Sequence, residues 1–298
     1  MALNEEEGRV ASSLERAQVK IRARLEAEEG GVFTDGQLHQ LLAQHGEKWE
    51  VGGSVSGRRF IEFLVEKIGL RVVELRSEHY RRILRYALGE YSPYLMALSL
   101  RPRSYLTHGT AVLLHGLNDQ LPKVIYANQE QSEKPRGGEL SQERLTLAFS
   151  RHQRTSAYVY TFEGRRVVLL SGKQTKRLGV VSMKGPQGEG LPVTSIARTL
   201  VDIVVRPAYS GGIIQVLEAY RGARGKVDAG ELVRTLRKLD YVYPYHQAIG
   251  FLMERAGYPA EECAKLGRLG MQFDFYLIHG MKKPKRDPKW RLFFPEGV

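Results

Sequence analysis

The amino-terminal part of the chain places apolar side chains at helical spacing. In residues 9–29 they recur every three or four positions, which predicts one amphipathic helix. Its apolar stripe consists of Val10, Leu14, Ala17, Ile21 and Leu25. The pair Gly30-Gly31 follows the stripe and predicts the end of this helix, because glycine readily adopts the left-handed conformation that closes a helix.

Two more helices are expected before the first strand. One takes its N-cap from Thr34 or Asp35 and ends near Trp49, since a side-chain oxygen there accepts from the free backbone N–H groups of the first turn. The other begins after a glycine pair and takes its cap from Ser54 or Ser56. Its apolar positions share one face, so it is expected to pack against its neighbours.

A β-hairpin is expected directly after the third helix. That helix covers residues 57–68, and two strand-like runs follow at 70–76 and 79–86 around a tight turn at Ser77-Glu78. Three helices followed by a β-hairpin are the plan of a winged helix-turn-helix, whose third helix enters the major groove of DNA. Residues 1–88 are therefore predicted to form a DNA-binding domain.

Beyond residue 88 the pattern mixes helices with short strands. Helices are expected at 92–100, 107–117, 195–205, 211–221, 228–238 and 245–256. Strands are expected at 123–127, 145–149, 158–162, 166–171, 178–183 and 290–294. The fold class is thus α+β, with an N-terminal winged helix-turn-helix at 1–88 followed by a larger mixed α/β C-terminal domain at 89–298.

Length and charge narrow the class of partner. A chain of 298 residues has room for two domains, and its net charge of +12 favours a polyanion such as nucleic acid. No run approaches the roughly 18 apolar residues of a membrane span, so no membrane association is expected. The acidic amino terminus does not have the character of a secretory signal, and Cys263 has no second cysteine to pair with. We expect a cytoplasmic protein in which Cys263 is a buried apolar residue.

The third helix and the hairpin carry the basic residues expected to contact DNA. Arg58 and Arg59 stand in the first turn of that helix, where they can reach guanine edges or phosphates. Glu62 and Glu66 share the same face and repel phosphate, so an ordinary solvated face is the alternative interpretation. The predicted DNA-binding residues are Ser56, Arg58, Arg59, Arg71, Arg76, Arg81, Arg82 and Arg85.

Residues 31–88 have a net charge of only +2, which is small for tight binding of DNA by a monomer. One remedy is a homodimer on an inverted repeat, formed through the apolar stripe of residues 10–25. The other is a second basic surface that binds the same DNA, an RNA or the acidic surface of a partner protein. Its residues are Arg144, Arg151, Arg154, Arg165, Arg166, Lys173, Lys176, Arg177 and Lys184, against a single carboxylate, Glu163. Charges on alternate strand positions are also typical of a plain solvent face.

Catalytic signatures are not recognisable in the chain. Gly172-Lys173 has neither the earlier glycine nor the following hydroxyl of a phosphate-binding loop. One cysteine and widely spaced histidines do not make a zinc site. Gly53-Ser54 is not followed by the paired carboxylates of a nucleotidyltransferase, and Asp202 and Asp274 stand alone. We therefore expect no cofactor, no metal and no enzymatic activity.

Four segments together resemble the AbiEi family of antitoxins. They are Ser104 to Leu117, Leu191 to Asp202, Tyr243 to Gly257, and Asp287 to Pro295, read as SYLTHGTAVLLHGL, LPVTSIARTLVD, YPYHQAIGFLMERAG and DPKWRLFFP. Their order and spacing extend over about 190 residues, which makes the resemblance more specific than any single motif. Each segment also has a structural interpretation, in which His108 and His115 pack in the core and Arg198 pairs with Asp202 on an exposed helix face.

The resemblance implies an antitoxin that binds its own promoter as a transcriptional repressor. It also implies that the C-terminal domain counteracts a nucleotidyltransferase-like toxin encoded in the same operon, directly or indirectly. Two alternatives stay open at this point. One is a free-standing DNA-binding regulator, and the other is a nucleic-acid-processing enzyme that uses Asp202 or Asp274.

Overall fold

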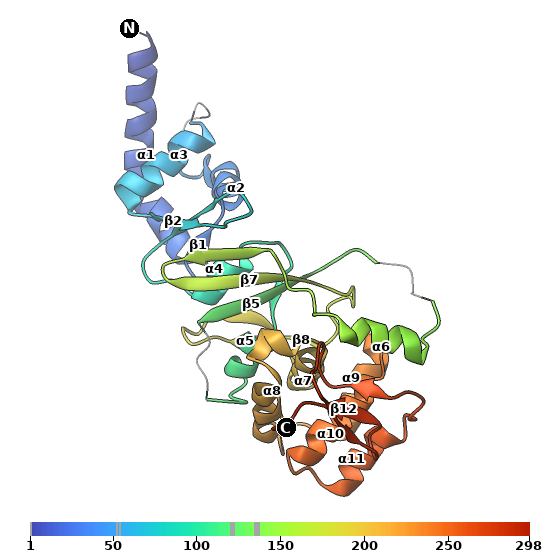
Figure 1. The fold of residues 1–298 in the computed structure, drawn as a ribbon. Coiled ribbons are helices and arrows are strands. Elements are labelled where there is room, and N and C mark those ends of the chain that lie inside the picture. Colours follow the sequence, from blue (N-terminus) through green and yellow to red (C-terminus); the bar gives the residue numbers. More distant parts are fainter. Residues whose placement is uncertain (1, 52, 54, 120–122, 134–137) are drawn as a thin grey trace. The chain divides into compact units, whose positions relative to one another are not determined.

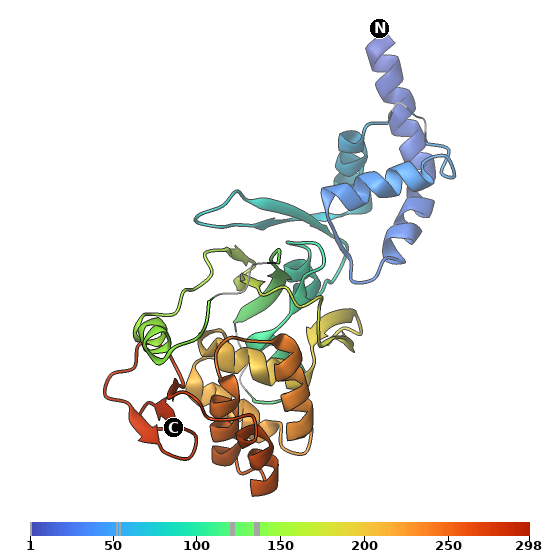
Figure 2. The same ribbon diagram turned by 90° about the vertical axis from the view of Figure 1, so that its right-hand side faces the viewer.

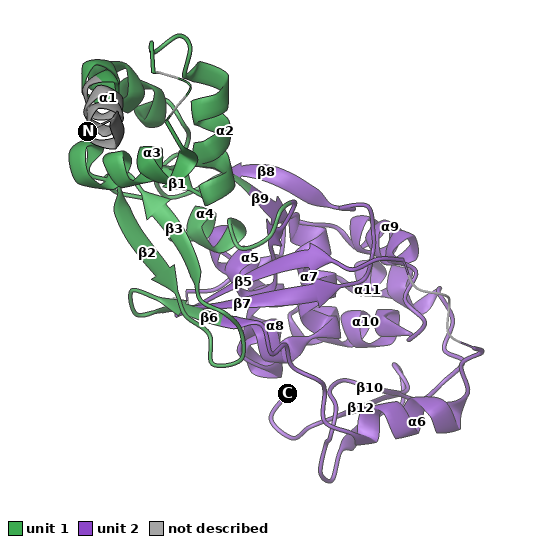
Figure 3. Ribbon diagram, turned by 90° about the horizontal axis from the view of Figure 1, so that it is seen from above, with its two compact units in different colours: residues 1–102, 160–165, 184–191 green, residues 103–159, 166–183, 192–298 purple. Residues whose placement is uncertain are grey.

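The computed structural model describes residues 2–51, 53, 55–119, 123–133 and 138–298, with side chains from Ser13 onward. The chain divides into two compact units, shown in green and purple in Figure 3. Unit 1 comprises residues 1–102, 160–165 and 184–191, and unit 2 comprises 103–159, 166–183 and 192–298. The sequence predicted a single boundary at residue 88, whereas two later segments of the chain belong to the first unit. Val10 and Ser54, both named in the predictions above, lie outside the described side chains.

Unit 1 begins with helices and a small antiparallel sheet. Its elements are α1 (Ala2–Glu26), β1 (Val32–Phe33), α2 (Asp35–His45), α3 (Gly57–Phe63), β2 (Arg71–Leu75), β3 (Ile83–Ala87) and α4 (Pro93–Leu98). A π-helical turn, Leu64–Ile68, continues α3 without a break. The sheet order is β1-β3-β2, with Val32 opposite Ala87 and Val73 opposite Arg85.

The apolar stripe of α1 lies in the core of unit 1. Leu14, Ala17, Ile21 and Leu25 are at most 2% exposed and pack with Phe60 and other apolar side chains. This stripe was suggested above as a dimer contact, but the unit's own helices already cover it. The capping box at Thr34, where the side chains of Thr34 and Gln37 each bond the other's backbone N–H, fixes the start of α2.

The hairpin has a longer tip than the sequence predicted. β2 ends at Leu75 and β3 begins at Ile83, so residues 76–82 form a loop instead of a two-residue turn. Figure 2 shows this hairpin extending beyond the helices of unit 1. Three of the arginines predicted to contact DNA, Arg76, Arg81 and Arg82, therefore lie on this loop and not on a regular strand.

A six-stranded sheet, in the order β6-β7-β5-β4-β9-β8, organises the middle of the chain. Its strands are β4 (Tyr105–Leu106), β5 (Val124–Glu130), β6 (Val159–Phe162), β7 (Arg165–Gly172), β8 (Val180–Lys184) and β9 (Gly190–Thr194). β5 and β7 run parallel, with Val124 opposite Arg166, and β4 is antiparallel to β5 and parallel to β9. The fold class is therefore α+β, as predicted.

Helices make up most of the remainder of unit 2. They are α5 (His108–Leu114), α6 (Gln142–Ser150), α7 (Ile196–Val205), α8 (Ile213–Gly222), α9 (Ala229–Leu239), α10 (Tyr245–Arg255) and α11 (Ala260–Gly267). A small sheet, β10-β12-β11, consists of β10 (Phe275–Tyr276), β11 (Lys285–Asp287) and β12 (Leu292–Phe294). α10 and α11 lie side by side near the carboxyl terminus (Figure 1). None of the helices in the described part of the chain is both long and apolar enough to cross a membrane.

One predicted strand is a helix, and several short elements were missed. Residues 145–149 were expected to be a strand but lie in α6, where Leu145 and Phe149 are one helical turn apart and both buried. Ser141 caps this helix by accepting from Arg144 N. The strands β1, β4, β9, β10 and β11 and the helix α11 were not predicted. The expected burial of Cys263 is confirmed, since it is 1% exposed, and Trp290 is buried to the same extent.

Candidate functional site

The first turn of α3 presents two arginines to solvent. Ser56 Oγ accepts from Arg59 N at 3.2 Å and so fixes the start of the helix. Arg58 and Arg59 both reach Glu62, at 3.0 and 3.5 Å, and the Arg58 side chain is 90% exposed. The hydrogen bond from Arg58 lowers the pKa of Glu62. Exposed pairs of this kind contribute little to stability, so both guanidinium groups remain able to exchange Glu62 for phosphate.

Removal of the cap should loosen the start of α3. Ser56→Ala is expected to lower the free energy of unfolding of unit 1 by about 1 kcal/mol, because Arg59 N loses its acceptor. Of the two tryptophans, Trp49 stacks on Phe60 of α3 with ring centroids 6.1 Å apart, so its fluorescence in a Trp290→Phe background reports this helix during urea unfolding. Ser56→Asp keeps a capping oxygen and should match the parent. If Ser56→Ala and Ser56→Asp lose the same free energy of unfolding, the capping oxygen makes no contribution to stability.

The tip of the β2–β3 hairpin gathers three of the predicted arginines. Arg76 and Arg82 share Glu74, with nitrogen–oxygen distances of 2.9 and 3.1 Å, and both side chains are at least 70% exposed. Arg81 is exposed as well, and no ion pair of its side chain is found among the described residues. The tip therefore carries three exposed arginines, two of which share one carboxylate.

Two other predicted arginines have partners inside unit 1. Arg71 pairs with Glu163 at 2.8 Å and lies 5.2 Å from the centre of the Tyr91 ring. Arg85 is partly buried and donates to Ser99 Oγ and Ser99 O at 2.8 and 2.6 Å. Since its guanidinium group already holds the end of α4, we assign Arg85 a structural role. Neither contact could be predicted from the sequence. Glu163 is 92 residues from Arg71, and Ser99 lies on a different element from Arg85, at the end of α4.

The second basic set is not one surface. Arg165 and Lys184 belong to unit 1, and the other seven residues belong to unit 2. Arg144 donates to Glu139 O, Arg177 donates to Arg103 O and lies over the Tyr105 ring, and Arg166 and Lys176 are exposed. Only Arg151, Arg154 and Lys173 come together, around one cavity of unit 2. This grouping follows from the fold, since two of these residues follow α6 and the third follows β7.

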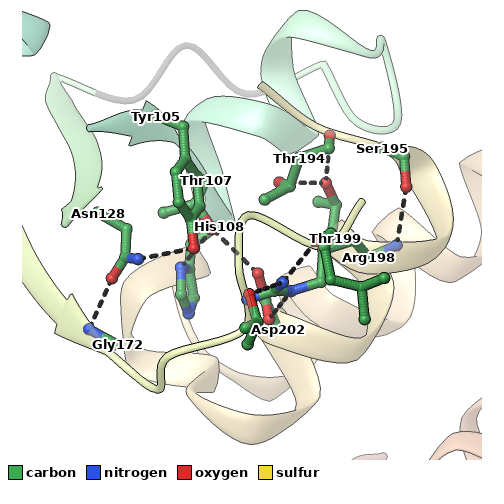
Figure 4. Close-up of polar contacts among 12 residues, drawn as sticks. Tyr105, Thr107, His108, Asn128, Gly172, Thr194, Ser195, Arg198, Thr199 and Asp202 are labelled. Carbon is green, nitrogen blue, oxygen red and sulfur yellow. Dashed lines mark hydrogen bonds and ion pairs between the residues drawn. The ribbon is translucent and has the colours of Figure 1, made fainter. Parts of the chain in front are cut away.

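A buried polar network lies between β4, β5 and α7 (Figure 4). Arg198 Nε donates to Asp202 Oδ1 at 2.7 Å, and both side chains are only 5% exposed. The sequence predicted this pair but placed it on an exposed face, which is wrong. Arg198 Nη1 also donates to Leu178 O at 2.7 Å, because the segment before β8 covers this side of α7. Thr107 Oγ1 donates to Asp202 Oδ2 at 3.2 Å and so completes the surroundings of the carboxylate.

At the edge of this network lies His108, whose backbone conformation and protonation differ from those of an ordinary exposed histidine. Its backbone is left-handed, with φ of 50°, and its side chain is 8% exposed. Nδ1 lies 3.0 Å from Thr107 Oγ1, whose proton points to Asp202, so Nδ1 carries the hydrogen and Nε2 is an acceptor. Among the described residues no group bonds Nε2. Burial lowers the pKa of His108 to about 4, which keeps the ring neutral.

The buried His108 makes the stability of unit 2 depend on pH. His108 binds a proton near pH 6.5 in the unfolded chain but only near pH 4 in the folded protein. The contribution of His108 to the free energy of unfolding is therefore complete above pH 6.5 and declines as the pH falls towards 4. The loss from this residue is expected to be roughly 3 kcal/mol at most. His115, His246 and His279 shift in the same direction through burial.

The contribution of His108 is isolated by comparison with His108→Asn, since asparagine tolerates a left-handed backbone. Urea unfolding is followed by Trp290 fluorescence in a Trp49→Phe background, at pH 7 and at pH close to 4.5. The decline between the two pH values should be smaller in the variant by roughly 2 kcal/mol. Equal declines would contradict the assignment of a buried neutral imidazole.

The isolated acids are engaged in ion pairs. Asp274 accepts from Arg286 and Arg291 at 3.0 and 2.9 Å, and Asp202 pairs with Arg198. In the part of the chain that the structure describes, no three His, Cys, Asp or Glu side chains converge as metal ligands. The chemistry available in unit 1 is thus charge attraction by exposed arginines. In unit 2 it is a buried neutral imidazole and a basic cavity.

The chain resembles a solved structure in its fold. The crystal structure of the RV2827C protein from Mycobacterium tuberculosis matches with a TM-score of 0.58 and 17% sequence identity, over 95% of this chain and 91% of that one. No protein-family model matches the chain, and no curated protein matches its sequence. The likeness concerns the fold alone, which is α+β in this chain.

Proposed function

We propose that this protein is a transcriptional repressor with a winged helix-turn-helix, that it binds the promoter of its own operon, and that it serves as the antitoxin to a co-encoded nucleotidyltransferase-like toxin. In this proposal it has no catalytic activity of its own. The observation that carries the DNA-binding half is the arginine pair in the first turn of α3, with the Arg58 side chain 90% exposed.

The order of elements in unit 1 supports a winged helix. α1, β1, α2, α3 and the β2–β3 hairpin follow one another, and β1 joins β3 to close a three-stranded sheet. In a winged helix-turn-helix the third helix reads the major groove. In our proposal the hairpin tip at 76–82 is the wing, and its arginines contact phosphates on either side of that groove.

The ion pairs of the free protein explain how unit 1 tolerates this charge. Glu62 partly neutralises Arg58 and Arg59, and Glu74 partly neutralises Arg76 and Arg82. On DNA the arginines would leave these carboxylates for phosphates, which releases counterions and makes binding strongly salt-dependent. Arg81 needs no such exchange, so we expect it to contribute most among the tip residues.

Binding of the purified protein to its own promoter fragment and to a scrambled fragment, across a salt series, tests the repressor half. We expect promoter-specific binding that is lost when Arg58, Arg59, Arg81 and Arg82 are all changed to alanine. If each contacts one phosphate, the slope of log affinity against log salt should shrink by about 3 to 4. The matched control removes four exposed charges of unit 2 at Arg234, Arg237, Lys238 and Arg268. Equal weak binding to both fragments, unchanged in the first variant, would overturn the proposal.

The antitoxin half rests on the resemblance of four segments, three of which lie wholly or mainly in the helical part of unit 2. Co-expression with the neighbouring toxin gene tests it by growth of the host. Rescue of growth by the repression-defective variant, expressed from a foreign promoter, would support neutralisation independent of DNA binding. Promoter binding without any rescue would instead favour a free-standing regulator.

A further inference from the structure

Unit 2 contains a large cavity that the proposed function does not use. Its volume is about 1010 Å³, near the upper end of the range for small-ligand sites. Among the described residues its cationic lining consists of Arg151, Arg154, Lys173 and Arg206, against the carboxylates of Glu133 and Asp240. Counted over these arginine, lysine and carboxylate side chains, the lining has a net charge of +2. A concave site with this charge favours an anionic ligand.

Two of the four cations of this cavity, Lys173 and Arg206, donate to backbone oxygens, while Arg151 and Arg154 are exposed. Lys173 Nζ donates to Leu239 O and Asp240 O, at 2.8 and 2.7 Å, at the end of α9. Arg206 Nη1 donates to Arg154 O at 2.7 Å. No ion pair of Arg151, Arg154 or Arg206 is found in the described part of the chain. Their charge is therefore available to a ligand, and Arg206 is already ordered by its bond to Arg154 O.

Aromatic rings line the same cavity. Tyr241 and Tyr243 are half-buried, and Tyr245 lies deeper. Tyr243 packs edge-on against Phe149 with centroids 5.3 Å apart, and Tyr241 packs edge-on against Tyr245 at 5.4 Å. These contacts fix the rings as a wall. Cations beside fixed aromatic rings are the combination by which proteins bind nucleotides, because the cations attract phosphate and the rings stack on bases.

A smaller cavity of about 300 Å³ adjoins the first and shares Arg154 and Arg206 with it. The ring of His108 forms part of its wall. This ring has an acceptor nitrogen without a partner among the described residues and stands on a strained, left-handed backbone. Strain and an unused buried acceptor are features that binding sites retain. They mark the smaller cavity as part of the same candidate site.

We infer that unit 2 binds a nucleoside phosphate, with the phosphate at Arg151, Arg154 and Arg206 and the base against Tyr241 and Tyr243. The phosphate lies at Arg154 and Arg206, which the two cavities share, and the smaller cavity continues the site towards His108. The ligand is either a free nucleotide or the phosphorylated end of a nucleic-acid strand, since both present the same group. This inference does not depend on DNA binding by unit 1.

Calorimetric titration of the full chain tests the inference with AMP, GMP, CMP and UMP, and with inorganic phosphate as a probe of charge alone. At least one nucleotide is expected to bind about tenfold or more tightly than phosphate, owing to stacking of its base. Arg151→Ala with Arg154→Ala should weaken this binding at least tenfold. Arg154 O, which anchors Arg206, is kept in that variant. Arg234→Ala with Arg268→Ala removes equal charge outside both cavities and should bind as the parent does.

Tyr243→Leu separates recognition of the base from attraction of charge. It should reduce nucleotide affinity to that of inorganic phosphate, while Tyr243→Phe retains the preference. A short RNA with a 5′-phosphate, compared with the same RNA carrying a 5′-hydroxyl, distinguishes a strand end from a free nucleotide as the ligand. The inference is overturned if inorganic phosphate or polyglutamate binds as tightly as every nucleotide, or if the double arginine variant binds nucleotide unchanged.

Discussion

Asp202→Ala is expected to lower the free energy of unfolding of unit 2 by about 3 to 5 kcal/mol, because it leaves a guanidinium group buried without its carboxylate. Arg198 and Asp202 are each 5% exposed and are joined at 2.7 Å. Burial alone would lower the pKa of Arg198, but the charge of Asp202, two nearby tyrosines and the hydrogen bond to Asp202 together outweigh burial and raise this pKa. Because a guanidinium group keeps its proton in proteins, Arg198 stays charged in the variant and carries the cost of desolvation without its carboxylate.

Urea unfolding followed by Trp290 fluorescence, in the Trp49→Phe background, measures this loss without the salt that guanidinium would add. Asp202→Asn keeps an acceptor for Thr107 and should lose less than Asp202→Ala. Replacing the pair by Arg198→Met and Asp202→Leu should restore stability to within about 1 to 2 kcal/mol of the parent. A loss below about 1 kcal/mol for Asp202→Ala would mean that water reaches the guanidinium group, as it would on the exposed face the sequence suggested.

This ion pair shows what helical spacing can and cannot establish. Residues four apart on α7 must be neighbours, so the sequence identified the pair correctly. Its burial depends on Leu178 and Thr175, whose segment lies over Arg198 and is some twenty residues away in the chain. Every residue from Ala197 to Val204 is buried, so α7 has no exposed face. The spacing of residues along a helix does not show which distant segments of the chain cover that helix.

The same reasoning explains the errors in unit 1. Glu163 and Glu189 belong to that unit although they come from distant segments, because Glu163 pairs with Arg71 and accepts from Tyr91 while Glu189 accepts from Ser92. A boundary drawn from local composition cannot include them. The helices α2 and α3 were predicted well, since side-chain caps at Thr34 and Ser56 begin them within the sequence itself.

The candidate sites differ in how far the sequence could predict them. Arg58 and Arg59 follow a recognisable cap, so their place in the first turn of a helix was predictable. The cavity of unit 2 was not, because Arg154, Lys173 and Arg206 meet only through the packing of three separate elements. The basic residues between 144 and 184 indicated an anionic partner in this region, but only the fold shows which of them lie together.

The second large effect is expected at the contact between Gly250 and Trp290. Gly250 lies within α10, and a Cβ atom added there would stand 2.1 Å from Trp290 Cζ3 and 2.2 Å from Cη2. The ring cannot move aside easily, since it is 1% exposed and its Nε1 donates to Glu254 Oε2 at 2.6 Å. Gly250→Ala should therefore destabilise unit 2 by about 2 to 3 kcal/mol through overpacking, although alanine is the better helix former by about 1 kcal/mol.

Removal of the ring should reverse the sign of this effect. Trp290→Ala alone is expected to cost about 3 to 5 kcal/mol, because it leaves a cavity in the core. In that background Gly250→Ala has no ring to meet, so it should stabilise unit 2 by about 1 kcal/mol through helix propensity. Urea unfolding followed by circular dichroism at 222 nm gives all four free energies, and the coupling between the two sites should reach about 3 kcal/mol. If Gly250→Ala destabilises equally with and without the ring, the glycine is required by the helix backbone and not by its contact with Trp290.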